Sequence, residues 1–252
     1  MLPCASPPDF RRCGSAMHPD SHISTKRLKQ AIKLLLYFLV ARVTVSIVWN
    51  YRSYLPPDFL QGRESYFFRR YQWAFYVHIV FGPVALLLGT VLISEHFRAR
   101  LPRGHRILGR VQTVCVLLLI VPSGLWMAFY ADAGVIAGTG FAALSLATGG
   151  FAVLGFRAAI RRRLVQHRRW MWRCYLMMFS AVVLRIIGGI ALIGGLETAW
   201  TYPFAAWASW LLPLAVFEVI ERVRTSERQS PEEIDVLNPA VEGRIPGARL
   251  PE

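Results

Sequence analysis

Six long apolar runs constrain this chain more than any other feature of its sequence. They cover residues 34–51, 73–94, 110–131, 134–156, 172–194 and 203–221. A helix that crosses a bilayer needs about 20 mostly apolar residues, and each run is close to that length. The runs are continuous, without the alternation of barrel strands, so helices are the elements that can satisfy their backbone hydrogen bonds in lipid. The sequence therefore predicts an all-α fold, a polytopic integral membrane protein built as a six-transmembrane-helix bundle.

The polar ends of the chain predict two tails around this membrane domain. Residues 1–30 and 224–252 show no apolar periodicity, and we expect both to be disordered tails. The membrane domain then covers residues 31–223. The first apolar run is not followed by a small-residue cleavage site, so we expect it to remain as a span.

The basic residues predict how the bundle is oriented. The formal net charge is +14, but the cations lie in short clusters between apolar runs, where topology signals are found. One side of the predicted membrane carries nineteen Lys and Arg residues, and the other carries four, at Arg52, Arg63, Arg69 and Arg70. We therefore expect a bacterial inner-membrane protein with both termini in the cytoplasm. Its expected partners are the lipid bilayer and anionic lipids at the cytoplasmic face, with no role for nucleic acid.

Two ionisable residues are predicted inside spans near the outer side of the membrane. His78 lies roughly 8 Å, and Arg185 roughly 14 Å, below the outer helix ends, by the rise of an α-helix. Such residues are costly in lipid unless they are paired or hydrated. We expect them to share a polar cavity in which Arg185 binds an anionic group and His78 exchanges a proton. The alternative is an arginine that reaches the interface alone, beside a structurally satisfied histidine.

Two further ionisable residues are predicted inside spans nearer the cytoplasm. Glu218 lies about a turn from the inner end of the last span, and Arg42 lies roughly 12 Å from the same side. An ion pair between them would neutralise two charges in an unfavourable environment. We therefore predict a structural Arg42–Glu218 pair.

Two similar basic motifs open the third and fifth spans, and both begin with histidine. They are His105-Arg106-Ile107-Leu108-Gly109-Arg110 and His167-Arg168-Arg169-Trp170-Met171-Trp172-Arg173. If His105 and His167 ligate a haem b, nearby arginines would meet its carboxylates. The same cluster could instead bind an anionic lipid head group or phosphate, through Arg106, Arg110, Arg168 and Arg173. A third interpretation is topology and helix capping alone.

Glycine and proline predict where helices pack closely and where they bend. Glycines concentrate in the fourth and fifth spans, which we expect to be central in the bundle. They include Gly134, Gly138, Gly149, Gly150, Gly155, Gly188 and Gly189. Proline removes a helical hydrogen bond, so we expect kinks at Pro83, Pro122 and Pro213.

These motifs together resemble the domain-of-unknown-function 2306 family of predicted bacterial membrane proteins, over residues 34–222. The resemblance is carried by Pro57-Asp58-Phe59-Leu60, His78 with Gly82, His105-Arg106 with Gly109-Arg110, His167-Arg168 with Trp170-Met171 and Arg173, and by Arg185 and Glu218. A more distant similarity is to dihaem cytochrome b bundles, in which histidines on core helices hold haem. That similarity implies haem at His105 and His167, although His78 lacks a partner histidine in the fourth span.

The sequence favours a binding protein over an enzyme. It contains no nucleophile elbow, no glycine-rich phosphate loop and no paired intramembrane carboxylates, so nothing indicates a hydrolase. The enzyme class that stays open is a membrane redox protein with haem b. We predict an intramembrane His/Arg site for an anionic ligand or lipid, with a haem-binding electron-transfer protein as the alternative.

Overall fold

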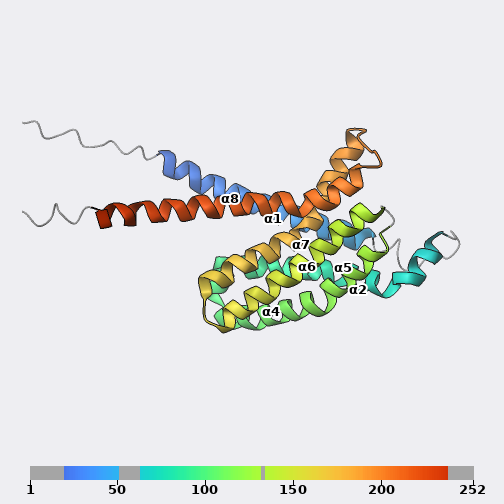
Figure 1. Cartoon of the computed structure of the whole chain (residues 1–252), viewed down its shortest axis with the longest axis horizontal. Coiled ribbons are helices and arrows are strands. Elements are labelled where there is room, and N and C mark those ends of the chain that lie inside the picture. The colour runs from blue at the N-terminus through green and yellow to red at the C-terminus, as the bar shows by residue number, and fades with distance from the viewer. Residues whose placement is uncertain (1–19, 51–62, 132–133, 238–252) are drawn as a thin grey trace, which may run out of the picture. The chain divides into compact units, whose positions relative to one another are not determined.

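The computed structural model describes residues 20–50, 63–131 and 134–237, and every regular element within these ranges is helical. In chain order the elements are α1 (Asp20–Asn50), α2 (Arg63–Ile93), α3 (Glu95–Arg100), α4 (Pro102–Cys115), η3 (Val116–Ile120), α5 (Val121–Phe129), α6 (Gly134–Ile160), α7 (Leu164–Ile193) and α8 (Thr201–Leu237) (Figure 1). No strand occurs among the described residues, which confirms the all-α prediction.

Six helical stretches of the described chain are long and apolar enough to cross a membrane. They are Gln30–Trp49, Gln72–Ile93, Pro102–Phe129, Gly134–Ile160, Leu164–Ile193 and Thr201–Ser226. Each overlaps one of the six predicted runs, which confirms the predicted class of fold. Large apolar side chains remain exposed along them, including Leu118 on η3 and Val153 on α6. Such extensive apolar exposure is expected of surfaces that face lipid.

The chain divides into two compact units, residues 1–39 and 40–252, with the division inside α1. In the first unit, α1 exposes Leu34, Leu35 and Phe38, as a lipid-facing helix would. Helix α1 begins at Asp20 and α8 continues to Leu237, so helix extends into both segments predicted as tails. Residues 1–19 and 238–252 lie outside the described residues, and the predicted domain boundaries stay predictions.

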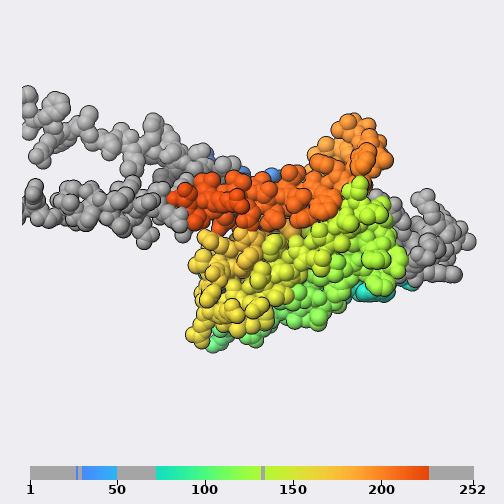
Figure 2. Space-filling view, in the orientation of Figure 1, coloured from blue at the N-terminus to red at the C-terminus, as the bar shows by residue number. Residues whose placement is uncertain are grey.

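Helix α6 is the central element of the second unit. It packs against α4, η3, α5, α7 and α8, and Figures 1 and 2 show it beside α7. Two of its glycines permit this closeness. A Cβ at Gly138 would lie 2.8 Å from the Ala128 carbonyl oxygen, and one at Gly155 would lie 2.6 Å from the Met171 sulfur. The prediction of a glycine-mediated central helix is therefore confirmed for α6.

The glycines of α7 have no such role. A Cβ at Gly188 or Gly189 would meet nothing within 4 Å, and the same holds for Gly150 on α6. Close approach of helices therefore depends on particular glycines and not on the glycine content of a span.

The third span contains a π-helical turn where the sequence predicted a proline kink. In η3, which precedes Pro122, the N–H of Val121 bonds to the Val116 carbonyl five residues earlier. A π-helical turn inserts one residue and so rotates the following residues by about 100° relative to a continuous α-helix. This rotation sets the direction of Ser123 and Gly124, which begin the part of α5 that meets His78.

Candidate functional site

A cavity of about 620 Å³ opens within residues 40–252, among helices α2, η3, α5, α6, α7 and α8 and the second half of α1. This volume is in the range of small-molecule sites. Most of its wall is apolar, with contributions from Phe75, Leu86, Val121, Phe141, Leu144 and Met177. A few polar side chains interrupt that wall, among them His78, Tyr130, Ser145, Arg185 and Tyr202. We call this space the His78–Arg185 cavity.

The ring of His78 is oriented by Ser123. Its Nδ1 lies 3.1 Å from Ser123 Oγ, and that hydroxyl lies 2.5 Å from the Leu119 carbonyl oxygen and 3.1 Å from that of Ile120. A carbonyl oxygen only accepts, so the one hydroxyl proton of Ser123 is committed to its own helix. We therefore assign His78 Nδ1 as the donor to Ser123 Oγ. In the neutral ring, Nε2 is then the acceptor nitrogen.

Gly124 allows this part of α5 to lie close to its neighbours. A Cβ built on Gly124 would lie 2.6 Å from Ser145 Oγ and 3.4 Å from His78 Cε1. Ser123 is fully buried and Gly124 is buried, whereas His78 is partly exposed and lines the cavity. The short residues of α5 therefore pack closely behind the imidazole.

Arg185 lines the same cavity from α7. Its Nη1 donates to the Ala181 carbonyl oxygen at 2.9 Å, so the guanidinium lies over the preceding turn of its own helix. Its charge is close enough to act on both His78 and Tyr202. The structure thus brings His78 and Arg185 to the wall of one cavity, in keeping with the prediction that both line a cavity near the outer side. That a ligand binds there stays a prediction.

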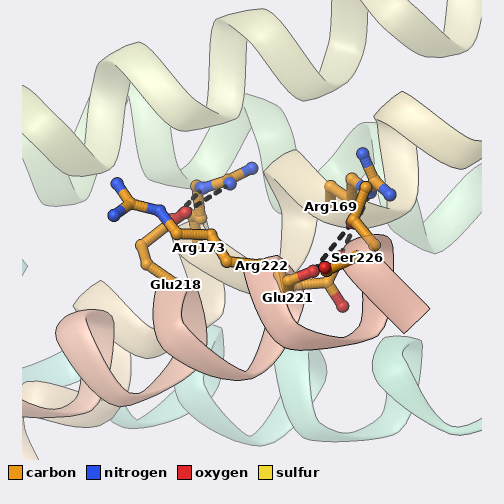
Figure 3. A pocket seen from close by; sticks show the side chains of 7 residues that line it. Arg169, Arg173, Glu218, Glu221, Arg222 and Ser226 are labelled. Atoms are coloured by element: carbon orange, nitrogen blue, oxygen red, sulfur yellow. Dashed lines mark hydrogen bonds and ion pairs between the residues drawn. The ribbon is translucent and has the colours of Figure 1, made fainter. Parts of the chain in front are cut away.

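A second polar region joins α7 to α8, nearer the other end of α7. Arg173 forms an ion pair with Glu218, with Nε 2.5 Å from Oε1 and Nη2 2.9 Å from Oε2. Arg169 pairs with Glu221 at 3.1 Å. Figure 3 shows both pairs bridging the two helices around a pocket of about 320 Å³, with Arg222 extending from α8 along it. We call these five residues the α7–α8 charge cluster.

Glu218 has a different ion-pair partner from the predicted one. The prediction paired it with Arg42, but the carboxylate binds Arg173 at both oxygens. Arg173 also lies over the Trp170 ring at 4.7 Å and over the Phe217 ring at 5.5 Å. Arg42 is exposed on α1. Arg173 of α7, the helix that packs against α8, therefore takes the place of Arg42 in the ion pair.

The two motif histidines lie in the first turns of α4 and α7, as predicted. His167 Nδ1 donates to the Gly155 carbonyl oxygen at 2.8 Å, which leaves Nε2 as its acceptor nitrogen. His105 is near enough for His167 to act on it electrostatically. Its Nδ1 is buried and has no hydrogen-bond partner among the described residues. Neither histidine lines the His78–Arg185 cavity or the pocket of the charge cluster.

The other arginines predicted to bind an anion are dispersed. Arg168 pairs with Glu95 of α3 at 2.6 Å, and Arg106 donates from Nε to the Pro102 carbonyl oxygen of its own helix at 3.3 Å. Arg110 is exposed on α4. Arg106, Arg168 and Arg173 thus have different partners. The four arginines, with Arg110, do not line a common cavity among the described residues.

Comparison with protein-family models identifies a family. A family model described as "Predicted membrane protein (DUF2306)" matches residues 75–220. No curated protein and no solved structure matches the chain. The matched range contains His78, both histidine motifs, Arg185 and Glu218, whereas the Pro57–Leu60 motif lies outside it and outside the described residues. The similarity to cytochrome b gains no support from these comparisons.

Proposed function

We infer that this chain, which belongs to the DUF2306 family of predicted membrane proteins, binds an anionic ligand with an apolar body in the His78–Arg185 cavity. The observation behind this proposal is a space of about 620 Å³ with an apolar wall and one guanidinium. The apolar wall suits a hydrocarbon body, and Arg185 suits an acidic head group. An amphiphile of this kind also partitions into the bilayer that surrounds the helices.

Binding of a simple amphiphile tests this proposal. We expect radiolabelled decanoate to bind detergent-purified protein, and acetate, which lacks the apolar body, not to compete. Decanol lacks the charge and should compete weakly. Replacing Arg185 by Leu should weaken decanoate binding about tenfold or more, because a charge-assisted hydrogen bond is lost.

Arg161→Leu is the matched control, since Arg161 is exposed in the turn between α6 and α7. The control variant should bind decanoate as the wild type does. Equal affinity of the wild type and Arg185→Leu, or no binding of decanoate to folded protein, would contradict the proposal.

We also propose that the protein lies in a bacterial inner membrane with both termini in the cytoplasm. The support is the excess of Lys and Arg on one side of the six spans. A reporter active only in the cytoplasm should give signal when inserted near Arg161 and none when inserted near Gly62. The reverse pattern would overturn this orientation.

Haem binding by His105 and His167 is the second candidate function. The bond from His167 Nδ1 to Gly155 O favours it, because histidines that ligate metals commonly donate the other nitrogen in this way. The His105 Nδ1 atom has no such described acceptor, so the pair fits haem less well. A Soret band that disappears in both His105→Ala and His167→Ala would establish this function, and a colourless folded protein would remove it.

A further inference from the structure

We propose that anion binding in the His78–Arg185 cavity is coupled to the uptake of one proton by His78. This inference rests on the proposed function and specifies how its site works. The bound state then holds a monoanionic head group between an imidazolium and a guanidinium. One anion and one proton enter together, so binding adds no net charge to the cavity.

Ser123 fixes the tautomer of the neutral His78 ring. Ser123 Oγ is buried and lies within hydrogen-bonding distance of two backbone carbonyl oxygens, and one of these, that of Ile120, is also a hydrogen-bond partner of His78. Because a carbonyl oxygen only accepts, we assign the proton of the neutral ring to Nδ1, on the side that faces Ser123. Nδ1 therefore carries a proton in both the neutral and the charged ring. The neutral ring can change only at Nε2, which gains a proton when the imidazolium forms.

The protonation state of His78 Nε2 decides whether the ring repels or binds an anion in the same cavity. An unprotonated Nε2 presents a lone pair, which repels the lone pairs of a carboxylate oxygen. A protonated Nε2 instead donates a charge-assisted hydrogen bond to that oxygen. An anion attracted by Arg185 thus stabilises the protonated form of His78, and by linkage the proton strengthens anion binding by the same factor.

Few groups around His78 can exchange a proton near neutral pH. The titratable and charged side chains that share the described wall are Tyr130 of α5, Arg185 of α7 and Tyr202 of α8. Phenols ordinarily titrate near pH 10, and guanidinium groups stay charged above pH 12. Between about pH 6 and pH 8, imidazole is the group type on this wall that ordinarily changes charge.

The proposal has a quantitative signature. Where the free ring is neutral and the free ligand is ionised, uptake of one proton makes Kd rise about tenfold per pH unit. Decanoate binding should therefore weaken about a hundredfold between about pH 6.5 and pH 8.5 if the free ring is neutral throughout that range. Decyl sulfonate stays ionised, and it should show the same slope because the proton enters on the protein.

Three variants separate this proposal from the proposed function. His78→Gln keeps a polar side chain that does not titrate, so decanoate Kd should become independent of pH. Arg185→Leu should weaken binding at every pH and keep the slope. Ser123→Ala should keep the slope as well, since the ring of His78 can still be protonated, but with binding a few-fold weaker because the ring is less well oriented.

The outcomes of this experiment are distinct. Decanoate binding to the wild type without pH dependence would overturn proton coupling and leave the proposed function intact. A slope for decanoate but none for decyl sulfonate would place the proton on the ligand and would also overturn it. No binding of either amphiphile to folded protein at any pH would overturn both proposals. A slope that persists in His78→Gln would assign the proton to another group and contradict the role of His78.

Discussion

The two polar regions of α7 each contain an arginine, but the surroundings of the two arginines differ. Arg173 meets the carboxylate of Glu218 on α8 and lies over two aromatic rings. Arg185, twelve residues or about 18 Å further along the helix, hydrogen-bonds a carbonyl of its own helix and lines a cavity of ligand size. The first charge is neutralised between two helices, and the second faces a space that a ligand can fill. The comparison separates a charge that stabilises the fold from one suited to binding.

The largest effect that tests this comparison is on stability. Arg173→Leu should lower the free energy of unfolding by about 1–3 kcal/mol, between the values for exposed and buried ion pairs, because the side chains of Arg173 and Glu218 are 16% and 32% exposed. Arg185→Leu should leave stability within about 0.5 kcal/mol of the wild type. Thermal unfolding in detergent measures both. If Arg185→Leu proved the more destabilising change, the two roles would have to be exchanged.

A second test concerns the frame around the cavity. A Cβ at Gly138 would press on the backbone carbonyl of Ala128, a residue of the cavity wall, at 2.8 Å. Gly138→Ala should therefore destabilise the protein by about 1–2 kcal/mol, as overpacking does. A Cβ at Gly150 on the same helix would meet nothing within 4 Å. Gly150→Ala should therefore stabilise the protein by about 0.5–1 kcal/mol. Equal unfolding temperatures of these two variants would show that α5 and α6 are not packed as closely as described.

The support behind His78 should have a smaller effect. Ser123→Ala removes the hydroxyl that orients the imidazole, and it should lower stability by about 0.5–1.5 kcal/mol, the usual net value of a hydrogen bond. A matched change is Thr139→Ala, since that exposed hydroxyl bonds to carbonyls of its own helix and not to His78. Chemical denaturation compares the two. A larger loss in Thr139→Ala would contradict the special position of Ser123.

The smallest expected effect is in the turn between α6 and α7. Arg162 has a φ of 57°, in the left-handed region that favours glycine. Arg162→Gly should raise the free energy of unfolding by about 0.5 kcal/mol. The φ of Arg161 is not positive, so Arg161→Gly should lower the free energy of unfolding by a similar amount. The difference between the two unfolding midpoints measures the strain directly. A more stable Arg161→Gly would mean that the turn has another conformation.

The class of fold could be predicted from the sequence because it depends on one-dimensional quantities. Run length and apolar content predicted six helices, and these correspond to the six stretches described here. The placement of His78 and Arg185 nearer the outer side followed from helical rise alone, and both residues line one cavity. Depth could not show which face of each helix carries the residue. Glu218 therefore forms an ion pair, as predicted, but with Arg173 in place of Arg42.

Ser123 was missed for a different reason. Its direction depends on the π-helical turn at Val116–Ile120, which shifts the helical register before α5. A pattern with a period of 3.6 residues assigns the wrong face to every residue after such a turn. Pro122 was a signal that the helix is irregular there, but proline more commonly indicates a kink. The contact between Ser123 and His78 thus depends on local geometry that sequence periodicity does not contain.

Anomalous diffraction can show whether an anionic amphiphile occupies the His78–Arg185 cavity. Crystals grown with an alkanoate brominated at its apolar end should show a bromine peak among Phe141, Leu144 and Met177, residues of the cavity wall. The carboxylate should lie within hydrogen-bonding distance of Arg185. At a ligand concentration near the wild-type Kd, the peak should be several-fold weaker in crystals of Arg185→Leu, as a tenfold loss of affinity requires. A peak found only on the lipid-facing surface, or one in the cavity that persists undiminished in the variant, would contradict the account.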